Sequence, residues 1–498
     1  RAIISRTEKE AKEYPILQNL DTNFQKIDEL PFDFERRRMS VIVKDDEGTV
    51  SMVTKGALEE MLTISTYVEY LGEIIPLTED IHKEVLAEVT QLNRQGLRVL
   101  GVGYKSGLRE DYAYAVTDES DMILTGYLAF LDPPKPSAAP AIKALLEHGV
   151  KTKILTGDNE KVTQAVCEKV GLDVDQILLG SDIDAMTDEE LAQAVEKVTV
   201  FAKLSPDQKA RIILQIKSNG HCVGYMGDGI NDAPSMKVAD VGISVDTAVD
   251  IAKETADVIL LDKDLMVLEK GLVEGRKVYA NMTKYIKMTV SSNFGNIFSL
   301  LVSGIFLPFL PMAPIHLIVL NLVYDLSCIA LPFDNVDEDF LKHPHKWEAK
   351  SITRFMIWMG PISSAFDILT FILLYFVIVP MATGQAYVHG AESATSFIIL
   401  FQTGWFIESM WSQTMVIHML RSAKLPFLQS RPSWFVLGTT LLAASFVTFL
   451  PYSSIASLLH LTPLEPIYFL FLLLIIVLYM ISVTVVKRLY IKKFKSWL

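Results

Sequence analysis

The sequence has few cysteines, no excess of positive charge and no basic patch with interleaved aromatic residues. Its three cysteines, Cys167, Cys222 and Cys328, are scattered without a CxxC pair. This spacing offers no disulfide or zinc framework and suits a reducing compartment. The net charge of −13 argues against a nucleic-acid partner. No signal peptide opens the chain, which starts with "RAIISRTEKE" and without Met, as a fragment or processed piece would.

Apolar and charged residues divide the chain into two different halves. Half of its 498 residues are apolar and 21% are charged, and this length predicts two or three domains. Up to about residue 287 the sequence is typical of a water-soluble α/β protein. Beyond it, apolar runs such as "IYFLFLLLIIVLYMISVTVV" are long enough to cross a bilayer of about 30 Å.

Six apolar stretches predict six membrane spans, with approximate ranges 288–307, 313–333, 355–380, 395–420, 432–450 and 466–486. After Lys287, every Lys and Arg lies between the second and third spans, between the fourth and fifth, or after the sixth. Because basic connections stay on the cytoplasmic side, we expect the soluble half and the C-terminal tail in the cytoplasm.

Predicted strands and helices alternate from about residue 128 to 262. The segments "VKTKILTG", "VTVFAKL" and "HCVGYM" are each expected to form a strand that leads into a helix. Repeated βαβ units predict a parallel sheet, which binds its ligand at the carboxyl ends of the strands. Polar residues occur at those ends in three clusters: Thr156, Gly157 and Asp158; Lys209; and Asp228 with Asp232.

These clusters contain the groups that a phosphoryl-transfer site needs. Glycine lets the backbone approach a ligand closely, and helix N-termini offer N–H groups to an anion. Thr156 and Lys209 suit phosphate oxygens, and the paired carboxylates suit Mg²⁺. Taken alone, "MGDGINDAP" would also fit an Asp-Gly turn and a helix N-cap. The order of all three clusters at strand ends favours the phosphoryl site.

Polar residues in the first two spans predict a cation site. Asn293 and Asn296 are three residues apart and share one helix face. Asn321 and Asp325 are four residues apart and share a face of the next helix. Their oxygens suit a hard cation, and an ionisable group in a bilayer costs about 2.5–3.5 kcal/mol on insertion scales. Interhelical hydrogen bonding is the alternative for the asparagines. Less favoured carboxylates lie in later spans, Asp367 and Glu408.

The motifs "TGDN", "SPDQK" and "GDGINDAP" resemble the phosphorylation domain of P-type ATPases, and "DPPK" at 132–135 resembles its return hinge. Upstream, "PFDFERRRMS", "TKGALEE" and "NRQGLRVLGVGYK" resemble the family's nucleotide-binding domain. The resemblance implies α/β domains followed by an all-α membrane domain. These are an α+β nucleotide-binding domain at 1–127, a haloacid-dehalogenase-like (Rossmann-like) phosphorylation domain at 128–280, and six transmembrane helices at 281–498.

The resemblance also implies roles for single residues and ATP with Mg²⁺ as cofactors. For the nucleotide, it implies that Phe32 stacks on adenine, with Phe34 as the alternative stacking residue. It also implies that Lys55 lines the nucleotide pocket and that Arg98 reaches toward the phosphates. For the phosphoryl group, it implies that Asp228 binds Mg²⁺ and that Lys209 neutralises an aspartyl phosphate. Thr156 would donate a hydrogen bond to the phosphate, and Asn231 and Asp232 would position the loop.

The sequence departs from the family in one respect. The nucleophile of these ATPases is the aspartate of a "DKTGT" stretch, which this chain lacks, since its one "DK", at Asp262, continues as "DL". The actuator loop "TGES" and four leading membrane helices are also absent. We expect all of these in the N-terminal remainder of the same pump, so that this chain alone forms no phosphoenzyme.

The segments "SSNFGNIFSLL", "NLVYDLS" and "FDNVD" look most like the bacterial magnesium-transporting P-type ATPases. In the calcium pumps a glutamate stands where this chain has Asn296, and fewer charges suit one partly hydrated Mg²⁺. The resemblance implies ATP-driven Mg²⁺ import across the bacterial inner membrane, with the bilayer as a further partner. Two alternatives stay open: a pump for Ca²⁺ or a monovalent ion, and a non-catalytic membrane regulator.

Overall fold

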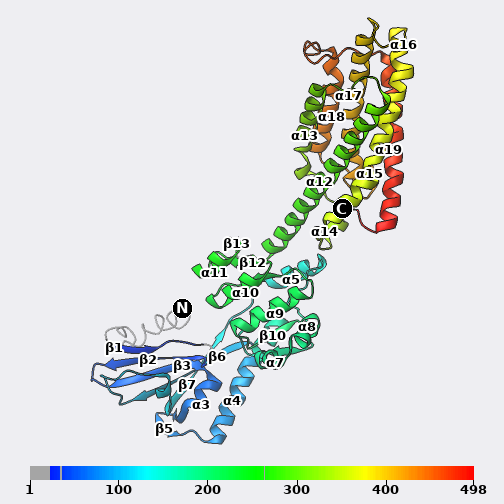
Figure 1. The fold of residues 1–498 in the computed structure, drawn as a ribbon. Coiled ribbons are helices and arrows are strands. Elements are labelled where there is room, and N and C mark those ends of the chain that lie inside the picture. Colours follow the sequence, from blue (N-terminus) through cyan, green and yellow to red (C-terminus); the bar gives the residue numbers. More distant parts are fainter. Residues whose placement is uncertain (1–22, 34–35, 263, 498) are drawn as a thin grey trace. The chain divides into compact units, whose positions relative to one another are not determined.

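The computed structural model describes residues 23–33, 36–262 and 264–497. The chain forms two compact units, which are described separately below (Figure 1). The first consists of Arg1–Leu146 and Lys151–Leu268, and the second of Glu147–Val150 and Glu269–Leu498.

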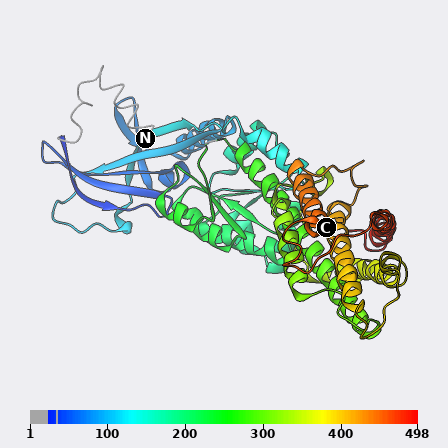
Figure 2. The same cartoon turned by 90° about the horizontal axis from the view of Figure 1, so that it is seen from above.

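A seven-stranded sheet forms the N-terminal part of the first unit, in the order β1-β2-β3-β6-β7-β4-β5. All neighbours are antiparallel except β4 and β7, which are parallel. Figure 2 shows the strands of this part in blue and cyan. The strands are β1 Phe24–Leu30, β2 Arg38–Asp45, β3 Val50–Ala57, β4 Ser65–Tyr70, β5 Glu73–Pro76, β6 Leu97–Ser106 and β7 Met122–Leu131. Helices α3 Leu58–Ile64 and α4 Glu79–Arg94 also belong to this part. In β3 buried and accessible residues alternate, with Met52 and Thr54 fully buried, as a sheet with one covered face requires.

Parallel strands and helices alternate in the rest of the first unit. The strands are β8 Ile154–Leu155, β9 Ile177–Leu179, β10 Val200–Ala202, β11 Gly224–Met226, β12 Val241–Val245 and β13 Val258–Leu260. The helices are α5 Ala138–Glu147, α6 Glu160–Lys169, α7 Gly180–Ala185, α8 Asp188–Lys197, α9 Pro206–Ser218, α10 Ala233–Val238 and α11 Asp250–Thr255. Ser205 caps α9 with Gln208 in a capping box, and Pro206 occupies its first turn, as the "SPDQ" segment predicts.

The predicted parallel pairing is confirmed, but the strands form two sheets in place of the one expected. Their orders are β8-β10-β9 and β11-β12-β13, so that β8 and β11 are both edge strands. Each sheet covers its own apolar cluster, and Leu155 of β8 packs against both clusters. Leu155 therefore links the two clusters, while no hydrogen bonds pair β8 with β11.

The second unit is a helical bundle (Figure 1). Its helices are α12 Met266–Phe306, α13 Pro314–Cys328, α14 Glu338–Leu341, α15 Ala349–Leu373, α16 Val379–Thr383, α17 Ala394–Leu420, α18 Trp434–Phe449 and α19 Pro466–Phe494. A π-helical turn at Leu374–Ile378 joins α15 to α16. At Gly295 and Gly360 the missing side chains let α12 and α15 approach closely, since a Cβ on Gly295 would lie 3.1 Å from the Gly360 carbonyl oxygen.

Five helices of the described chain are long and apolar enough to cross a membrane, and α17 is not among them. This helix, predicted as a span, carries polar residues such as Gln402, Glu408 and Gln413, all of them buried. It packs against α13, α15, α18 and α19. Because protein surrounds it on most sides, α17 does not need the apolar surface that a lipid-facing helix requires.

A buried ion-pair cluster joins three segments at one end of the bundle. The Oδ2 atom of Asp334 lies 2.9 Å from Lys284 Nζ and 2.8 Å from Arg421 Nε, and all three side chains are at most 2% exposed. Asn281 hydrogen bonds to the carbonyl oxygen of Asp334 and to Lys284. Two cations around one carboxylate fix α12 and α17 to the segment that follows α13.

Candidate functional site

An ion pair lies directly after β11, where the sequence predicts a phosphoryl site. Lys209 Nζ of α9 is 2.9 Å from Asp232 Oδ1, and their side chains are 11% and 14% exposed. Asp232 also accepts hydrogen bonds from the Tyr225 hydroxyl, at 2.7 Å, and from the Gly229 N–H, at 3.2 Å. The structure thus brings two of the predicted residues, Lys209 and Asp232, into contact and adds Tyr225, which the sequence reasoning missed.

These contacts keep Asp232 charged. Burial by itself raises the pKa of Asp232, but hydrogen bonds from Lys209 and Tyr225, with the positive charge of Lys209, hold the pKa below its ordinary value. Burial, together with the adjacent Asp232 carboxylate, raises the pKa of Tyr225, so the phenol stays a hydrogen-bond donor.

Two glycines explain the spacing of the "GDGIND" loop. A Cβ on Gly227 would lie 2.4 Å from Cβ of Asp232, so a side chain at this position would collide with the loop. Ser244 Oγ donates to the Gly227 carbonyl oxygen at 3.0 Å, which ties the loop to β12. Gly229 directs its N–H at Asp232. The glycines therefore serve the packing of the loop around Asp232.

Asp228 and Asn231 occupy more accessible positions on this loop. Asp228 is exposed, and its backbone carbonyl accepts a hydrogen bond from Val249 N at 3.1 Å. Asn231 is half-buried in a short 3-10 turn at Ile230–Asp232. Within the described ranges no group of three or more His, Cys, Asp or Glu residues could hold a metal ion. A magnesium ion at Asp228 would thus need further ligands, such as phosphate oxygens or water.

The "TGDN" segment turns directly after β8. The N–H of Asp158 donates to Thr156 Oγ1 at 3.1 Å, which leaves the hydroxyl hydrogen of Thr156 available to an acceptor. Backbone bonds from Lys203 N to the Asp158 carbonyl and from Leu204 N to the Thr156 carbonyl hold the turn against β10. Gly157, which lies between Thr156 and Asp158, is exposed. Thr156 and Asp228 therefore both follow edge strands, but no hydrogen bond joins their side chains.

The predicted nucleotide residues lie on the seven-stranded sheet. Phe32 is 50% exposed, as a stacking platform requires, whereas Phe34 lies outside the described residues. Lys55 on β3 and Arg98 on β6 are both exposed. Lys55 pairs with Val102, four residues from Arg98, so both basic side chains lie on the same face of the sheet.

Arg98 has a partner that the sequence did not indicate. Its guanidinium is 2.7 Å from Asp158 Oδ2 and 3.5 Å from Asp132 Oδ2. It thereby connects the sheet to the "TGDN" segment and to the "DPPK" segment within the first unit. Because Arg98 is half-exposed, the pair contributes little to stability, and the Arg98 side chain is accessible to a phosphate.

A buried carboxylate near the predicted nucleotide residues was also missed. Glu119 has a fully buried side chain and binds Arg36 at 2.6 Å, Arg38 at 2.8 Å and Ser40 at 2.6 Å. Burial raises the pKa of Glu119, but hydrogen bonds from Arg36, Ser40 and Arg38 lower it below the ordinary value. The arginines of "PFDFERRRMS" therefore hold this part of the sheet together.

The four predicted cation ligands of the bundle lie near its surface. Asn293, Asn321 and Asp325 are exposed, and Asn296 is half-buried. No hydrogen bond or ion pair joins these four side chains to one another. The buried carboxyl groups of the bundle are instead Asp367, which is 2% exposed, and Glu408, which is 1% exposed.

Comparisons with known proteins relate both units of the chain to P-type ATPases. Residues 2–137 match the family model of the P-type ATPase cytoplasmic domain N, and residues 309–489 match that of the cation transporting ATPase C-terminus. The magnesium-transporting ATPase, P-type 1, of Salmonella typhimurium strain LT2 is 50% identical over 477 residues, which are 96% of this chain and 52% of that protein. Its namesake from Escherichia coli K12 is 49% identical with the same coverage. A calcium-transporting ATPase of Bacillus subtilis strain 168 is 31% identical over 77% of this chain and 44% of that protein.

The chain belongs to the P-type ATPase family and is a multi-pass membrane protein. Within that family it resembles the magnesium-transporting members at about half identity, across both of its units. It spans about half the length of these relatives.

Proposed function

We propose that this chain is part of an ATP-driven magnesium pump of the bacterial inner membrane, which imports Mg²⁺ through an aspartyl-phosphate intermediate. The observation that carries the proposal is the Lys209–Asp232 pair beside the exposed Asp228, after a parallel strand. The 50% identity to a magnesium-transporting relative supports the choice of ion. As part of this proposal, the expected ranges 1–127, 128–280 and 281–498 would serve nucleotide binding, phosphorylation and membrane transport.

The residues after β8 and β11 fit a phosphoryl site that uses Mg²⁺. When bound, the ion would neutralise charge that develops on the phosphoryl group. Asp228 is the accessible carboxylate that would hold it, because Asp232 is engaged by Lys209 and Tyr225. Lys209 places a positive charge at this edge, and Thr156 has a hydroxyl hydrogen available for a phosphate oxygen. Phe32, Lys55 and Arg98 would bind ATP.

The nucleophile would come from the N-terminal remainder of the same pump. The sequence has no "DKTGT" stretch, and β8 and β11 are both edge strands whose side chains share an apolar cluster. A strand added between them would join the two parallel sheets into one haloacid-dehalogenase-like sheet. Its carboxyl end would then lie between Thr156 and Asp228, where an aspartate meets both.

In the membrane we propose six crossings, with α17 as the fourth, in addition to the five helices that are apolar enough to cross. The soluble domains and the C-terminal tail would lie in the cytoplasm, because the basic connections do. Asn293, Asn296, Asn321 and Asp325 would contact the transported Mg²⁺. Since three of them are exposed in this chain, helices of the N-terminal remainder would complete the site.

Ion flux into proteoliposomes that contain the full-length parent pump tests this proposal. We expect ATP-driven Mg²⁺ flux that is lost in Asp325→Asn. Asp339→Asn is the matched control, because Asp339 is 70% exposed and pairs with a surface lysine, Lys424. Ca²⁺ flux without Mg²⁺ flux would contradict the choice of ion. The absence of flux for both ions would contradict the transport function.

A further inference from the structure

A buried carboxylate, Glu119, lies next to the segment that carries Phe32. Its side chain is fully buried, shortly before β7. The Oε2 atom of Glu119 lies 2.6 Å from Arg36 Nη1 and 2.8 Å from Arg38 Nε, and its Oε1 atom accepts a hydrogen bond from Ser40 Oγ at 2.6 Å. These three partners are 79 to 83 residues away in the sequence. Two cations and a hydroxyl therefore compensate for the burial of the charge.

Arg36 extends this cluster to both neighbours of Phe32. Its Nη2 atom donates to the Pro31 carbonyl oxygen at 2.7 Å, and its Nε atom donates to Asp33 Oδ2. The backbone N–H of Arg36 also donates to Asp33 Oδ1, at 2.8 Å. One planar guanidinium thus contacts Glu119, Pro31 and Asp33 in fixed directions. Phe32, which is 50% exposed, lies between the two anchored residues.

The end of the same loop packs closely against β3. A Cβ on Gly56 of β3 would lie 2.5 Å from Cβ of Arg38 and 2.8 Å from the Arg37 carbonyl oxygen. Glycine at this position therefore lets the two segments approach closely. Gly56 directly follows Lys55, the basic residue expected to line the nucleotide pocket. The loop thereby holds Phe32 in a defined place relative to Lys55.

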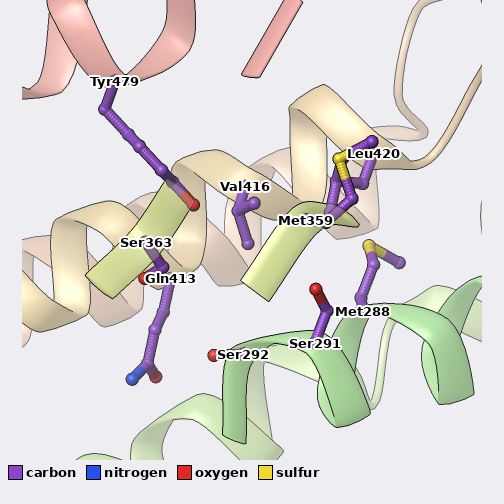
Figure 3. Close-up of a pocket in the computed structure, with 9 residues that line it drawn as sticks. All are labelled: Met288, Ser291, Ser292, Met359, Ser363, Gln413, Val416, Leu420 and Tyr479. Atoms are coloured by element: carbon purple, nitrogen blue, oxygen red, sulfur yellow. The ribbon is translucent and has the colours of Figure 1, made fainter. Parts of the chain in front are cut away.

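Not every buried polar group of the chain is satisfied by protein atoms in this way. Gln413 of the bundle is 4% exposed, and its Nε2 has no hydrogen-bond partner within the described residues. It lines a cavity of about 10 Å³, close to the space that the centre of one water molecule needs. The other polar side chains around the cavity are Ser291, Ser292, Ser363 and Tyr479 (Figure 3). Both oxygens of Glu119 and three nitrogens of Arg36 have protein partners instead, so the fold sets their positions.

Removal of the Glu119 charge would release Arg36. The Arg36 side chain is 13% exposed, and a buried cation that loses its carboxylate is unfavourable. The guanidinium would therefore turn toward solvent and give up its bond to the Pro31 carbonyl oxygen. Phe32 would then lose its fixed position, and the cost of ordering its side chain would be added to ligand binding.

We propose that Glu119 is a positioning residue for nucleotide binding, which acts through Arg36 to hold Phe32 in place for stacking on the adenine ring. The inference deepens the proposed function and rests on it, because the role of Phe32 in ATP binding belongs to that proposal. Glu119 itself does not touch the ligand. Loss of Glu119 and loss of the Arg36 guanidinium should therefore weaken the same part of ATP binding.

Equilibrium binding to the full-length parent pump tests the inference, with EDTA present so that ATP is not hydrolysed. Inorganic triphosphate is the second ligand, because it lacks the adenosine part. Stacking of a base on an aromatic side chain strengthens binding by about tenfold, so the wild type should prefer ATP, and Phe32→Ala should lose about tenfold of that preference. We expect Glu119→Gln and Arg36→Lys to lose about three- to tenfold each, with the affinity for triphosphate unchanged.

Arg38→Met is the matched control within the cluster. Arg38 also pairs with Glu119, but it follows the loop as the first residue of β2. We expect this variant to lose an ion pair and to keep its preference for ATP. Gel filtration of each variant shows whether it folds. If Glu119→Gln does not fold, Arg36→Lys gives the same test, because lysine keeps a cation beside Glu119 but lacks the fork of donors that reaches several partners.

A double variant separates positioning from a general loss of structure. If Glu119 acts through Phe32, Glu119→Gln combined with Phe32→Ala should lose no more preference for ATP than Phe32→Ala alone. In ATPase assays, Glu119→Gln should raise KM for ATP and leave kcat unchanged, because binding is weakened without a change in the chemical step.

Three results would overturn the positioning role of Glu119. They are a preference for ATP that persists in Glu119→Gln and Arg36→Lys, an equal loss in Arg38→Met, or additive losses in the double variant. A wild type that binds ATP no more tightly than triphosphate is a different result. It contradicts adenine stacking on Phe32, so that the proposed nucleotide site fails and the inference fails with it.

Discussion

Asp232 in the α/β unit and Asp367 in the bundle are both shielded from water, but they are neutralised differently. Lys209 lies 2.9 Å from Asp232, and its charge helps to lower the pKa of that carboxyl. Asp367 instead meets the hydroxyl of Ser299 and the indole N–H of Trp405. A loop at the surface can supply a lysine whose stem reaches solvent, whereas the middle of a bundle favours groups that need no countercharge.

At one end of the bundle Asp334, like Asp232, is paired with cationic side chains. Disruption of this Asp334 cluster should have the largest effect on stability. Asp334→Asn leaves Lys284 and Arg421 buried without their carboxylate, and we expect a loss of about 4 kcal/mol. Thermal unfolding of the detergent-solubilised protein measures it. Asp339→Asn removes an exposed pair with Lys424 and should cost less than about 1 kcal/mol. Equal losses of stability in the two variants would show that burial does not increase the contribution of the Asp334 cluster to stability.

Lys209→Met should have the next largest effect, now on activity. Loss of a positive charge from the proposed phosphoryl site should lower the ATPase rate of the full-length pump by about 10²–10³-fold, or about 3–4 kcal/mol. Lys217→Met, on the same helix and in a more exposed pair with Asp240, is the control and should keep normal activity. A similar loss in both variants would mean that helix α9, and not the charge at Lys209, was damaged.

Gly227→Ala should have a smaller, steric effect. Its Cβ would lie 2.4 Å from Cβ of Asp232, so the loop must shift at a cost of about 2 kcal/mol. Gly224→Ala is the control, because the nearest atom to its Cβ, Ile243 Cδ1, is 3.8 Å away. Chemical unfolding of both variants makes the comparison. An unchanged midpoint for Gly227→Ala would show that the loop is not closely packed on Asp232.

The smallest expected effect is a dependence of stability on pH. Because the folded-state pKa of Asp232 lies below its unfolded value, the stabilisation is present above about pH 3.9 and is lost as pH falls through the folded pKa. Urea unfolding of wild type and Lys209→Met at a series of acidic pH values measures it. The difference between the two should shrink as pH falls, and a constant difference would contradict the assigned ion pair.

The position of the "GDGIND" loop beside Lys209 could be predicted to a large extent, because strand ends in a parallel α/β fold bring distant motifs to one edge. The order of strands and helices from "VKTKILTG" onward follows from the alternation of apolar and polar segments. This order predicts that Lys209 and Asp232 lie at the same edge of the sheet. The hydrogen bond from Tyr225 and the pairing of Arg98 with Asp158 could not be predicted. They depend on side-chain directions across elements that are far apart in sequence.

In the bundle the sequence by itself determined which segments are apolar helices, where most of them begin and end, and which polar residues share a helix face. Only the tertiary structure decided which face turns inward. It placed Asn293, Asn321 and Asp325 at the surface of this chain and buried the less favoured Asp367 and Glu408. The physical reason is that a helix of this kind is apolar on all sides, so its rotation is set by contacts with neighbouring helices, such as the close approach of Gly295 and Gly360.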